Sequence, residues 1–403
     1  MRGQPGSSRG VIVHEWIEPT GGSEKVVDAI THILPGTDIV CLWDNDAGRF
    51  AGHRVSESVI ARTRLRGRKA LSTPVVPAVW RYRENQGYEW AVVSSHQFAH
   101  HVRFRGQDPD FRKFVYVHTP ARYLWTPELD PRGQNLAVRA VAPVLRAVDR
   151  RRAAEAESIA VNSRAVQDRV ATSWERESVV VYPPVDVDRI QACPDWSARL
   201  DALEAASLDQ LPAEFLLGAS RLVTYKRLDD VIRLGALLRM PVVIAGDGPE
   251  RGRLESQAAE TGVRATFLGR VSDELLYALY QRAAAYVFPA IEDFGIMPVE
   301  AMAAGARVIA AYRGGTAESV ADGITGALCD FGSPAECVAA VGRLSGLDAA
   351  DAQQRARLFS AEMFASRFRE WIGPVAGLPS TPSLASSSGQ PDWMPSLARA
   401  AVC

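Results

Sequence analysis

Two carboxylates carry the most specific chemical pattern in this sequence: Glu292 and Glu300, in the run EDFGIMPVE. We expect Glu292 to lie in a loop after a strand, Phe294-Gly295-Ile296 to open a helix, and Glu300 to lie about one turn inside it. The free N–H groups at a helix start can bind hydroxyl or phosphate oxygens, and a carboxylate on each side can accept two hydroxyls of a diol. This arrangement suits a nucleotide sugar. An acidic helix cap with a surface glutamate explains the same run.

Positive side chains and small residues follow two other predicted strands. Arg221 ends one strand, and Lys226 and Arg227 start the next helix. Cations placed there can neutralise a diphosphate and stabilise a leaving nucleotide, and they oppose the helix dipole, which favours an anionic ligand over a solvated helix start. Gly21 and Gly22 lie between the first strand and its helix, where the backbone can approach phosphates, although an ordinary loop explains them as well.

His118 ends a predicted strand in the run VYVHTPARYLW. There it can bond a sugar hydroxyl or a transient charge, and at pH 7 it can hold either protonation state; a structural histidine is the alternative. His96 follows another strand, on the side that we assign to an acceptor. Because the histidines have no Cys or carboxylate at ligand spacing, we expect no metal site. The D-x-D run at 44–46 predicts a turn rather than a metal ligand.

The composition is that of an ordinary globular protein, with 403 residues, 47% hydrophobic and 23% charged, and it excludes disorder as the dominant state. Lys and Arg number 46 against 47 Asp and Glu, so no overall charge indicates a nucleic-acid partner. The halves differ, with 27 basic against 22 acidic residues in 1–190 and 19 against 25 in 191–403. The scattered cysteines, the absence of an apolar leader and the lack of an 18-residue apolar stretch lead us to expect a soluble cytoplasmic protein.

Short β-branched or aromatic runs closed by turn residues predict two sets of strands. The first set is 10–16, 38–43, 89–96, 113–120, 158–163 and 178–184, and the second is 214–220, 241–247, 264–269, 284–290, 306–311 and 325–329. Helical stretches between them include 23–34, 135–157, 225–239, 272–284, 296–305 and 360–372. This alternation predicts an α/β protein with parallel sheets covered on both faces.

The run YPPVDVDRI, at 182–190, predicts a connection between two doubly wound, Rossmann-like domains that face a cleft. We expect an acceptor-side domain at 1–185 and a nucleotide-sugar domain at 186–359. We also expect the helix at 360–372 to pack back on the first domain, and the Pro-, Ser- and Gly-rich tail at 373–403 to be disordered.

These motifs together resemble family 4 of the retaining glycosyltransferases, which have the GT-B fold of two Rossmann-like domains. The resemblance spans most of residues 10–372 and is most specific over 218–321, which includes GDGPE, FLGRVSDELL, EDFGIMPVEAMAAG and RGGTAE. In the first half, GGSEKV, VYVHTPARYLW and VNSRAVQDRV resemble bacterial O-antigen and capsule mannosyltransferases, whose donor is usually GDP-mannose. Two departures stand out: Asp293 replaces the Gly or Ser of many members, and GGSEK replaces the commoner GGAE.

The resemblance implies roles for the residues that match its motifs. Gly21 and Gly22 would approach the donor diphosphate, which Arg221 and Lys226 would bind while they stabilise the leaving GDP. Glu292 would hold sugar hydroxyls beside the backbone of Phe294, Gly295 and Ile296, Glu300 would hold the ribose, His118 would contact the transferred sugar, and Asp273 would lie in the guanine loop.

The implied activity is a retaining transfer of a hexose, with mannose from GDP-mannose as the expected donor sugar. The implied acceptor is a lipid-linked or polysaccharide glycan of the cell envelope. We expect no metal or other cofactor, because two cations can neutralise the leaving diphosphate. A UDP-sugar donor and a nucleotide-sugar epimerase of the same architecture remain alternatives. An NAD-dependent oxidoreductase is disfavoured, because the run at 246–251 lacks the third glycine of the dinucleotide motif.

Residues 49–69 carry seven basic side chains against one acid, Glu57. Such a segment can attract anionic lipid headgroups, which predicts a peripheral contact with the inner face of the plasma membrane. A solubilising surface loop is the alternative interpretation.

Overall fold

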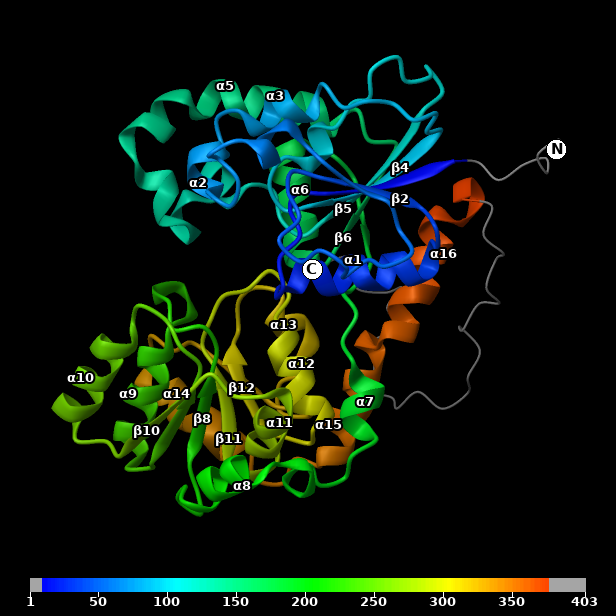
Figure 1. The fold of residues 1–403 in the computed structure, drawn as a ribbon. Coiled ribbons are helices and arrows are strands. Elements are labelled where there is room, and N and C mark those ends of the chain that lie inside the picture. Colours follow the sequence, from blue (N-terminus) through cyan, green and yellow to red (C-terminus); the bar gives the residue numbers. More distant parts are fainter. Residues whose placement is uncertain (1–8, 377–403) are drawn as a thin grey trace.

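Residues 9–376, which the computed structural model describes, form two parallel sheets with helices on both faces of each (Figure 1). The first sheet has seven strands in the order β3-β2-β1-β4-β5-β6-β7, and the second has six in the order β10-β9-β8-β11-β12-β13. In both sheets the order reverses beside the first strand of the domain, as in doubly wound folds that bind ligands at the carboxyl ends of their strands. The predicted α/β class with two Rossmann-like units is confirmed.

The predicted strands are all present. The first sheet contains β1 (Gly10–His14), β2 (Asp38–Cys41), β3 (Val55–Glu57), β4 (Trp90–Ser95), β5 (Arg112–Val117), β6 (Ser158–Val161) and β7 (Val179–Val180). The second contains β8 (Leu216–Ala219), β9 (Val242–Ala245), β10 (Ala265–Gly269), β11 (Ala285–Phe288), β12 (Val308–Ala311) and β13 (Ala327–Cys329). The sequence did not predict β3, because its three residues hold a single apolar side chain inside a basic segment.

Helices connect the strands and cover the sheets. The first domain has α1 (Gly22–Ile33), α2 (Lys69–Ser72), α3 (Val76–Trp80), α4 (Arg122–Trp125), α5 (Leu136–Ala153) and α6 (Arg164–Trp174). The remainder has α7 (Val187–Gln191), α8 (Ala202–Asp209), α9 (Leu228–Leu238), α10 (Arg251–Thr261), α11 (Asp273–Arg282), α12 (Ile296–Ala303), α13 (Thr316–Ser319), α14 (Pro334–Arg343), α15 (Ala349–Ala356) and α16 (Ala361–Ala376). None of the described helices is both long and apolar enough to cross a bilayer.

One predicted helix start is wrong. Lys226 does not open α9 but ends a single 3-10 turn, Thr224–Lys226. Arg227 then adopts the left-handed conformation, with φ of 55°, and α9 begins at Leu228. The turn directs Lys226 away from the helix and towards the loop after β11, as its ion pair with Glu292 shows.

The last helix returns to the first domain (Figure 1). Phe364 and Phe368 of α16 are fully buried in the apolar layer that also contains Ile12 of β1. The chain passes from the first domain to the second near Val185 and returns near Ser360. A β-bridge joins these two residues. The helix runs to Ala376, beyond the predicted end at 372. The rest of the predicted tail, 377–403, lies outside the described residues.

Candidate functional site

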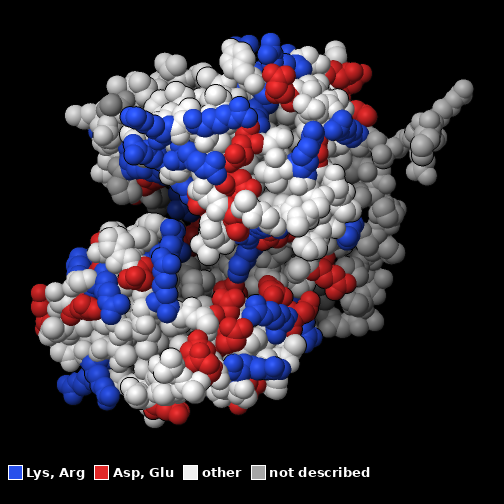
Figure 2. All heavy atoms as spheres, viewed as in Figure 1, with Lys and Arg blue, Asp and Glu red and all other residues white. Residues whose placement is uncertain are grey.

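The carboxyl ends of the two sheets meet at a hollow between the domains, which Figure 2 shows as a deep gap in the surface. Contacts across it join α1 to α12. Lys25 Nζ lies 2.9 Å from Glu300 Oε1, and a Cβ on Gly22 would come within 3.3 Å of Ile296 Cδ1. Gly22, Ile296 and Glu300, which are predicted site residues from both halves of the chain, therefore lie together.

The start of α12 is built around a glycine. Gly295 has φ of 87°, and a Cβ there would lie 2.6 Å from Thr316 Oγ1, so a larger residue would be strained. No described side chain caps α12, and the same is true of α1, which follows Gly21. The first N–H groups of α12 are therefore available to oxygens of a ligand. At the start of α1 the buried Glu24 carboxylate lies against Gly21, where a Cβ would come within 2.0 Å of Glu24 Oε2. Phe294 points away from this surface and packs against Tyr182 and Phe359, so it can contribute only its backbone.

Glu292 and Glu300 each hold a lysine. Lys226 Nζ lies 2.6 Å from Glu292 Oε1, and both side chains are largely buried. Glu300 is 8% exposed and pairs with Lys25 of the other domain. Burial lowers the pKa of Lys25, but Glu300, with a smaller contribution from Asp273, raises it overall. The loop before α12 and α12 itself thus each present one carboxylate, and each carboxylate is paired with an ammonium group from another element.

Two predicted residues lie at the margin of this group. Arg221 is exposed and donates a hydrogen bond to the hydroxyl of Tyr225. Asp273 is the first residue of α11; its side chain is 63% exposed, and it lies 3.5 Å from Arg189. Neither side chain is held in a fixed position by buried partners.

Asp293, the residue that departs from the family pattern, joins the two domains. Its carboxylate lies 2.5 Å from Arg122 Nη2 and 2.5 Å from Arg169 Nη1. Arg169 also donates to Thr119 Oγ1 at 2.6 Å. Burial alone would raise the pKa of Asp293, but the two guanidinium groups hold it below its ordinary value. The sequence did not predict this contact, because the two arginines lie more than a hundred residues before Asp293.

A third carboxylate of the second domain contacts the first domain. Glu318 accepts hydrogen bonds from the backbone N–H groups of Arg164 and Ala165, both at 2.9 Å, at the start of α6. Tyr182 also donates to it at 3.1 Å. A carboxylate at a helix start is stabilised by the helix dipole, so Glu318 caps a helix of the opposite domain.

His118 lies at the carboxyl end of β5, partly exposed, with its Nε2 2.8 Å from Ser94 Oγ. Burial lowers its pKa well below the ordinary value, with a further contribution from His96 and His14. The lowered pKa favours the neutral imidazole, whereas the sequence alone allowed either protonation state. His14, which the sequence analysis missed, is fully buried beside Ser94. Its place at the end of a predicted strand, like that of His118, could have identified it as a candidate site residue.

The expectation that the histidines lack carboxylate partners is wrong, because the fold brings two acids to them. One group is His14, Glu15 and His96, and the other is His100, His101 and Asp149, each with potential ligand atoms within 4.8 Å of one another. Hydrogen bonds account for both carboxylates. Glu15 accepts from the backbone N–H groups of His96, Gln97 and Ala99. Asp149 accepts from His101, Trp125 and Trp174, and His100 Nε2 lies 3.0 Å from its Oδ1. Both arrangements are explained as structural networks.

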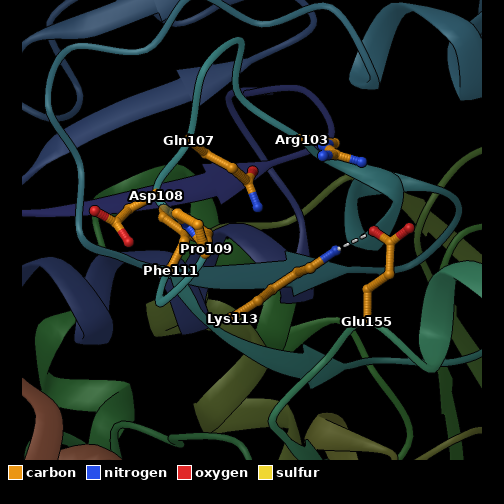
Figure 3. Close-up of a pocket in the computed structure, with 7 residues that line it drawn as sticks. All are labelled: Arg103, Gln107, Asp108, Pro109, Phe111, Lys113 and Glu155. Carbon is orange, nitrogen blue, oxygen red and sulfur yellow. Dashed lines mark hydrogen bonds and ion pairs between the residues drawn. The ribbon is translucent and has the colours of Figure 1, made fainter.

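A cavity of about 390 Å³ lies elsewhere on the first domain. Figure 3 shows the residues that line it. Its lining includes Lys113, whose Nζ lies 3.1 Å from Glu155 Oε2 and donates to the carbonyls of His100 and Val102. Burial lowers the pKa of Lys113 to about 8. The cavity lies near the amino ends of β5 and β6, away from Glu292, and the ammonium group is fully satisfied. This cavity is therefore separate from the candidate site.

Residues 204–358 match the family described as glycosyl transferases group 1. The matched segment runs from within α8 to Leu358, and so contains β8 to β13 of the second domain. Glu292 and Glu300 and their loop lie inside this domain, and the resemblance inferred from the motifs is confirmed there.

Curated relatives match about half of the chain. One relative is the GDP-mannose-dependent alpha-(1-6)-phosphatidylinositol monomannoside mannosyltransferase of Mycolicibacterium smegmatis, which is 31% identical over 217 residues. The matched region covers 50% of this chain and 56% of that relative. A second relative is the D-inositol 3-phosphate glycosyltransferase of Mycobacterium sp. (strain JLS), which is 32% identical over 202 residues. Here the matched region covers 47% of this chain and 45% of that relative. The chain thus spans about half the length of the curated relatives that it matches.

Solved structures share the whole two-domain fold. Anabaena Alr3699/HepE in complex with UDP and glucose matches with a TM-score of 0.66 at 19% identity, over 91% of this chain and 100% of that chain. Sucrose-phosphate synthase from Thermosynechococcus elongatus matches with a TM-score of 0.68 at 17% identity, over 92% and 99%. The GT-B fold predicted from the sequence is confirmed.

We expect Asp293→Ala to destabilise the protein by about 3 kcal/mol, because it leaves Arg122 and Arg169 with no partner for their charge in a largely buried contact. Urea denaturation measures the loss. The exposed carboxylate of Asp209 on α8 provides the control, and Asp209→Ala should change the free energy of unfolding by less than about 0.5 kcal/mol.

The difference between wild type and Asp293→Ala should depend on pH in one direction. Because the pKa of Asp293 is lowered in the fold, its contribution is complete above the ordinary carboxyl pKa of about 4. The contribution disappears as the pH falls through the lowered value. A difference that shrinks already between pH 8 and pH 6 would contradict the ion pairs described above.

Proposed function

We propose that this protein is a retaining hexosyltransferase that moves mannose from GDP-mannose to a lipid-linked or polysaccharide acceptor in cell-envelope glycan synthesis. One observation carries the proposal: Glu292 and Glu300 flank an uncapped helix start, each beside a lysine, at the hollow between the two domains of the GT-B fold. The donor assignment draws on the relatives at about 31% identity that are named GDP-mannose-dependent mannosyltransferases.

The proposed donor lies along the start of α12. Its diphosphate would compete with Glu292 for Lys226 and would also attract Arg221 at the rim. Glu292, once free of the ammonium group, would accept hydrogen bonds from two sugar hydroxyls. Glu300 would do the same for the ribose at the other end. A donor that replaces existing ion pairs gains only the difference between the two sets of contacts.

The proposed reaction breaks the bond between the sugar and the phosphate through an oxocarbenium-like state. Lys226 and Arg221 stabilise the negative charge that develops on the departing phosphate. The acceptor hydroxyl attacks from the face that the phosphate leaves, and the phosphate takes its proton. Contact between the domains excludes water and so limits hydrolysis of the donor. We propose that this chemistry needs no metal, because two cations serve the diphosphate.

A donor and acceptor panel tests the proposal against its alternatives. GDP-mannose, UDP-sugars and ADP-sugars would be offered with a lipid-linked acceptor extract, and products would be read by mass spectrometry. Since the names of both relatives contain an inositol phosphate or phosphatidylinositol unit, inositol phosphates belong in the panel. Transfer from a UDP-sugar alone would replace the donor assignment, and a changed nucleotide sugar without acceptor would indicate an epimerase.

Lys226→Ala should lower transfer by about 100-fold or more, because one preorganised charge that stabilises a leaving group is of this order. The measurement is the rate of GDP release with acceptor present. Arg264→Ala, an exposed cation just before the amino end of β10, is the control and should retain full activity. Near wild-type turnover of the Lys226 variant after EDTA treatment would overturn this role.

Glu292→Gln should damage turnover more than nucleotide binding. The amide keeps the size of the side chain but loses the charge that accepts sugar hydroxyls, so we expect kcat to fall about 10- to 100-fold with little change in the GDP dissociation constant. Calorimetry with GDP and a kinetic assay give the two numbers. Glu214→Gln, at an exposed position, is the matched control; equal losses of binding and turnover in Glu292→Gln would count against contact with the sugar.

We also propose a peripheral contact with anionic membrane through residues 49–69, although the fold reduces its charge. Four of the seven cations in this segment, Arg49, Arg54, Arg66 and Lys69, form ion pairs with acids. Arg62, Arg64 and Arg68 are exposed and have no ion pair among residues 9–376, and Val59 and Leu71 nearby are 66% and 61% exposed. Three free charges correspond to roughly 3 kcal/mol of attraction.

Changing Arg62, Arg64 and Arg68 together to Glu should abolish co-sedimentation with vesicles that contain phosphatidylglycerol, at low salt. A matched triple change to Glu uses three exposed arginines of the second domain, at 199, 264 and 307, and should leave binding intact. Equal loss in both triple variants would show a response to overall charge and not to this segment.

A further inference from the structure

A row of three polar side chains crosses the carboxyl edge of the first sheet. His14, Ser94 and His118 lie at the ends of β1, β4 and β5, which are adjacent in the sheet. Ser94 Oγ lies 3.1 Å from His14 Nδ1 and 2.8 Å from His118 Nε2. His14 and Ser94 are fully buried. One hydroxyl therefore links the two imidazole rings.

The single proton of Ser94 determines which ring donates. A hydroxyl has one proton and two lone pairs, so it can accept from both ring nitrogens or donate to one of them. His14 Nδ1 and His118 Nε2 are the partners of Ser94 Oγ within residues 9–376, so accepting from both rings would leave its buried proton without an acceptor. His14 Nδ1 also lies 3.4 Å from the carbonyl oxygen of Ser94, which can only accept. His14 Nδ1 therefore carries a hydrogen and donates to Ser94. The hydroxyl proton is then directed to His118 Nε2, so that nitrogen has none.

In the opposite arrangement Ser94 would donate to His14 Nδ1 and accept from His118 Nε2. The burial of His14 disfavours this arrangement. It would place a hydrogen on His14 Nε2, which is buried and has no hydrogen-bond partner within the described part of the chain. A buried N–H without an acceptor is rarer in folded proteins than an acceptor with an unused lone pair. Burial also lowers the pKa of both rings, so both are neutral at pH 7 and each carries one hydrogen.

We propose that His14 and Ser94 are positioning residues that hold His118 in its Nδ1–H tautomer, so that the ring offers a hydrogen-bond donor to an oxygen of the transferred sugar. The identity of that oxygen rests on the proposed function, whereas the tautomer rests on the fold alone. Nδ1 of His118 makes no hydrogen bond to residues 9–376, and the residue is partly exposed directly after β5. The neutral ring can thus donate to a sugar hydroxyl through Nδ1 but cannot take a proton there.

Nitrogen NMR of the protein labelled with ¹⁵N-histidine tests the tautomer without any substrate. We expect His118, assigned by the loss of its signals in His118→Gln, to have a protonated Nδ1 and an unprotonated Nε2. Ser94→Ala should remove this preference. Ser95→Ala is the matched control, because Ser95 is equally buried but contacts His100. A protonated Nε2 on His118 in the wild type would overturn the proposal.

Two pairs of variants test the effect on transfer. In His118→Asn the amide nitrogen lies near the place of Nδ1, and in His118→Gln it lies near that of Nε2. We expect the Asn variant to keep about tenfold more kcat/KM than the Gln variant, which corresponds to one hydrogen bond. For the same reason His14→Asn should retain more activity than His14→Gln. Equal kcat/KM within each pair would overturn the donor role of His118.

The two proposals can fail separately. If the NMR signals show the Nδ1–H tautomer while the wild type transfers sugar from none of the donors, the proposed function fails and the tautomer assignment stands. If transfer is found but His118 carries its hydrogen on Nε2, the proposed function stands and the linkage through Ser94 fails.

Discussion

The contact of Asp293 with Arg122 and Arg169 is the constraint on which the arrangement of the site depends. The carboxylate belongs to the loop of the second domain that also carries Glu292, and both guanidinium groups belong to the first domain. Glu300 and Glu318 follow the same rule, since each is an acid of the second domain that binds a positive group or helix start of the first. The unequal charge of the two halves of the sequence is thus used, in part, at the surface where they meet.

These contacts orient the domains more than they stabilise them. Removing two charges from water costs much of what their attraction returns, so a buried ion pair contributes little net stability but strongly disfavours arrangements in which either charge is unpaired. Only a narrow range of domain orientations satisfies Arg122, Arg169 and Asp293 together. In that range the start of α12 faces α1, and Lys25 reaches Glu300. The candidate site is therefore complete only when the domains are in contact.

The lysines beside Glu292 and Glu300 affect both binding and release. Each carboxylate is paired with an ammonium group in the fold, so the proposed donor would exchange partners with the protein at both ends. Exchange of this kind limits net affinity, which suits an enzyme that must release a nucleotide after each cycle. The neutral His118 on the opposite side adds a hydrogen-bonding group without adding charge.

The sequence by itself determined the strands, the two-domain α/β class and the motif from Glu292 to Glu300, because hydrophobic periodicity, turn residues and helix starts are local patterns. It missed β3, which is too short for a pattern, and it misplaced the start of α9, where Arg227 adopts a left-handed conformation. Only the tertiary structure decided which groups pair. Lys25 and Glu300 are 275 residues apart, and His14 and Ser94 are 80 apart. No local pattern encodes such pairs, because they form only when the strand order and the contact between the domains bring distant loops to one edge.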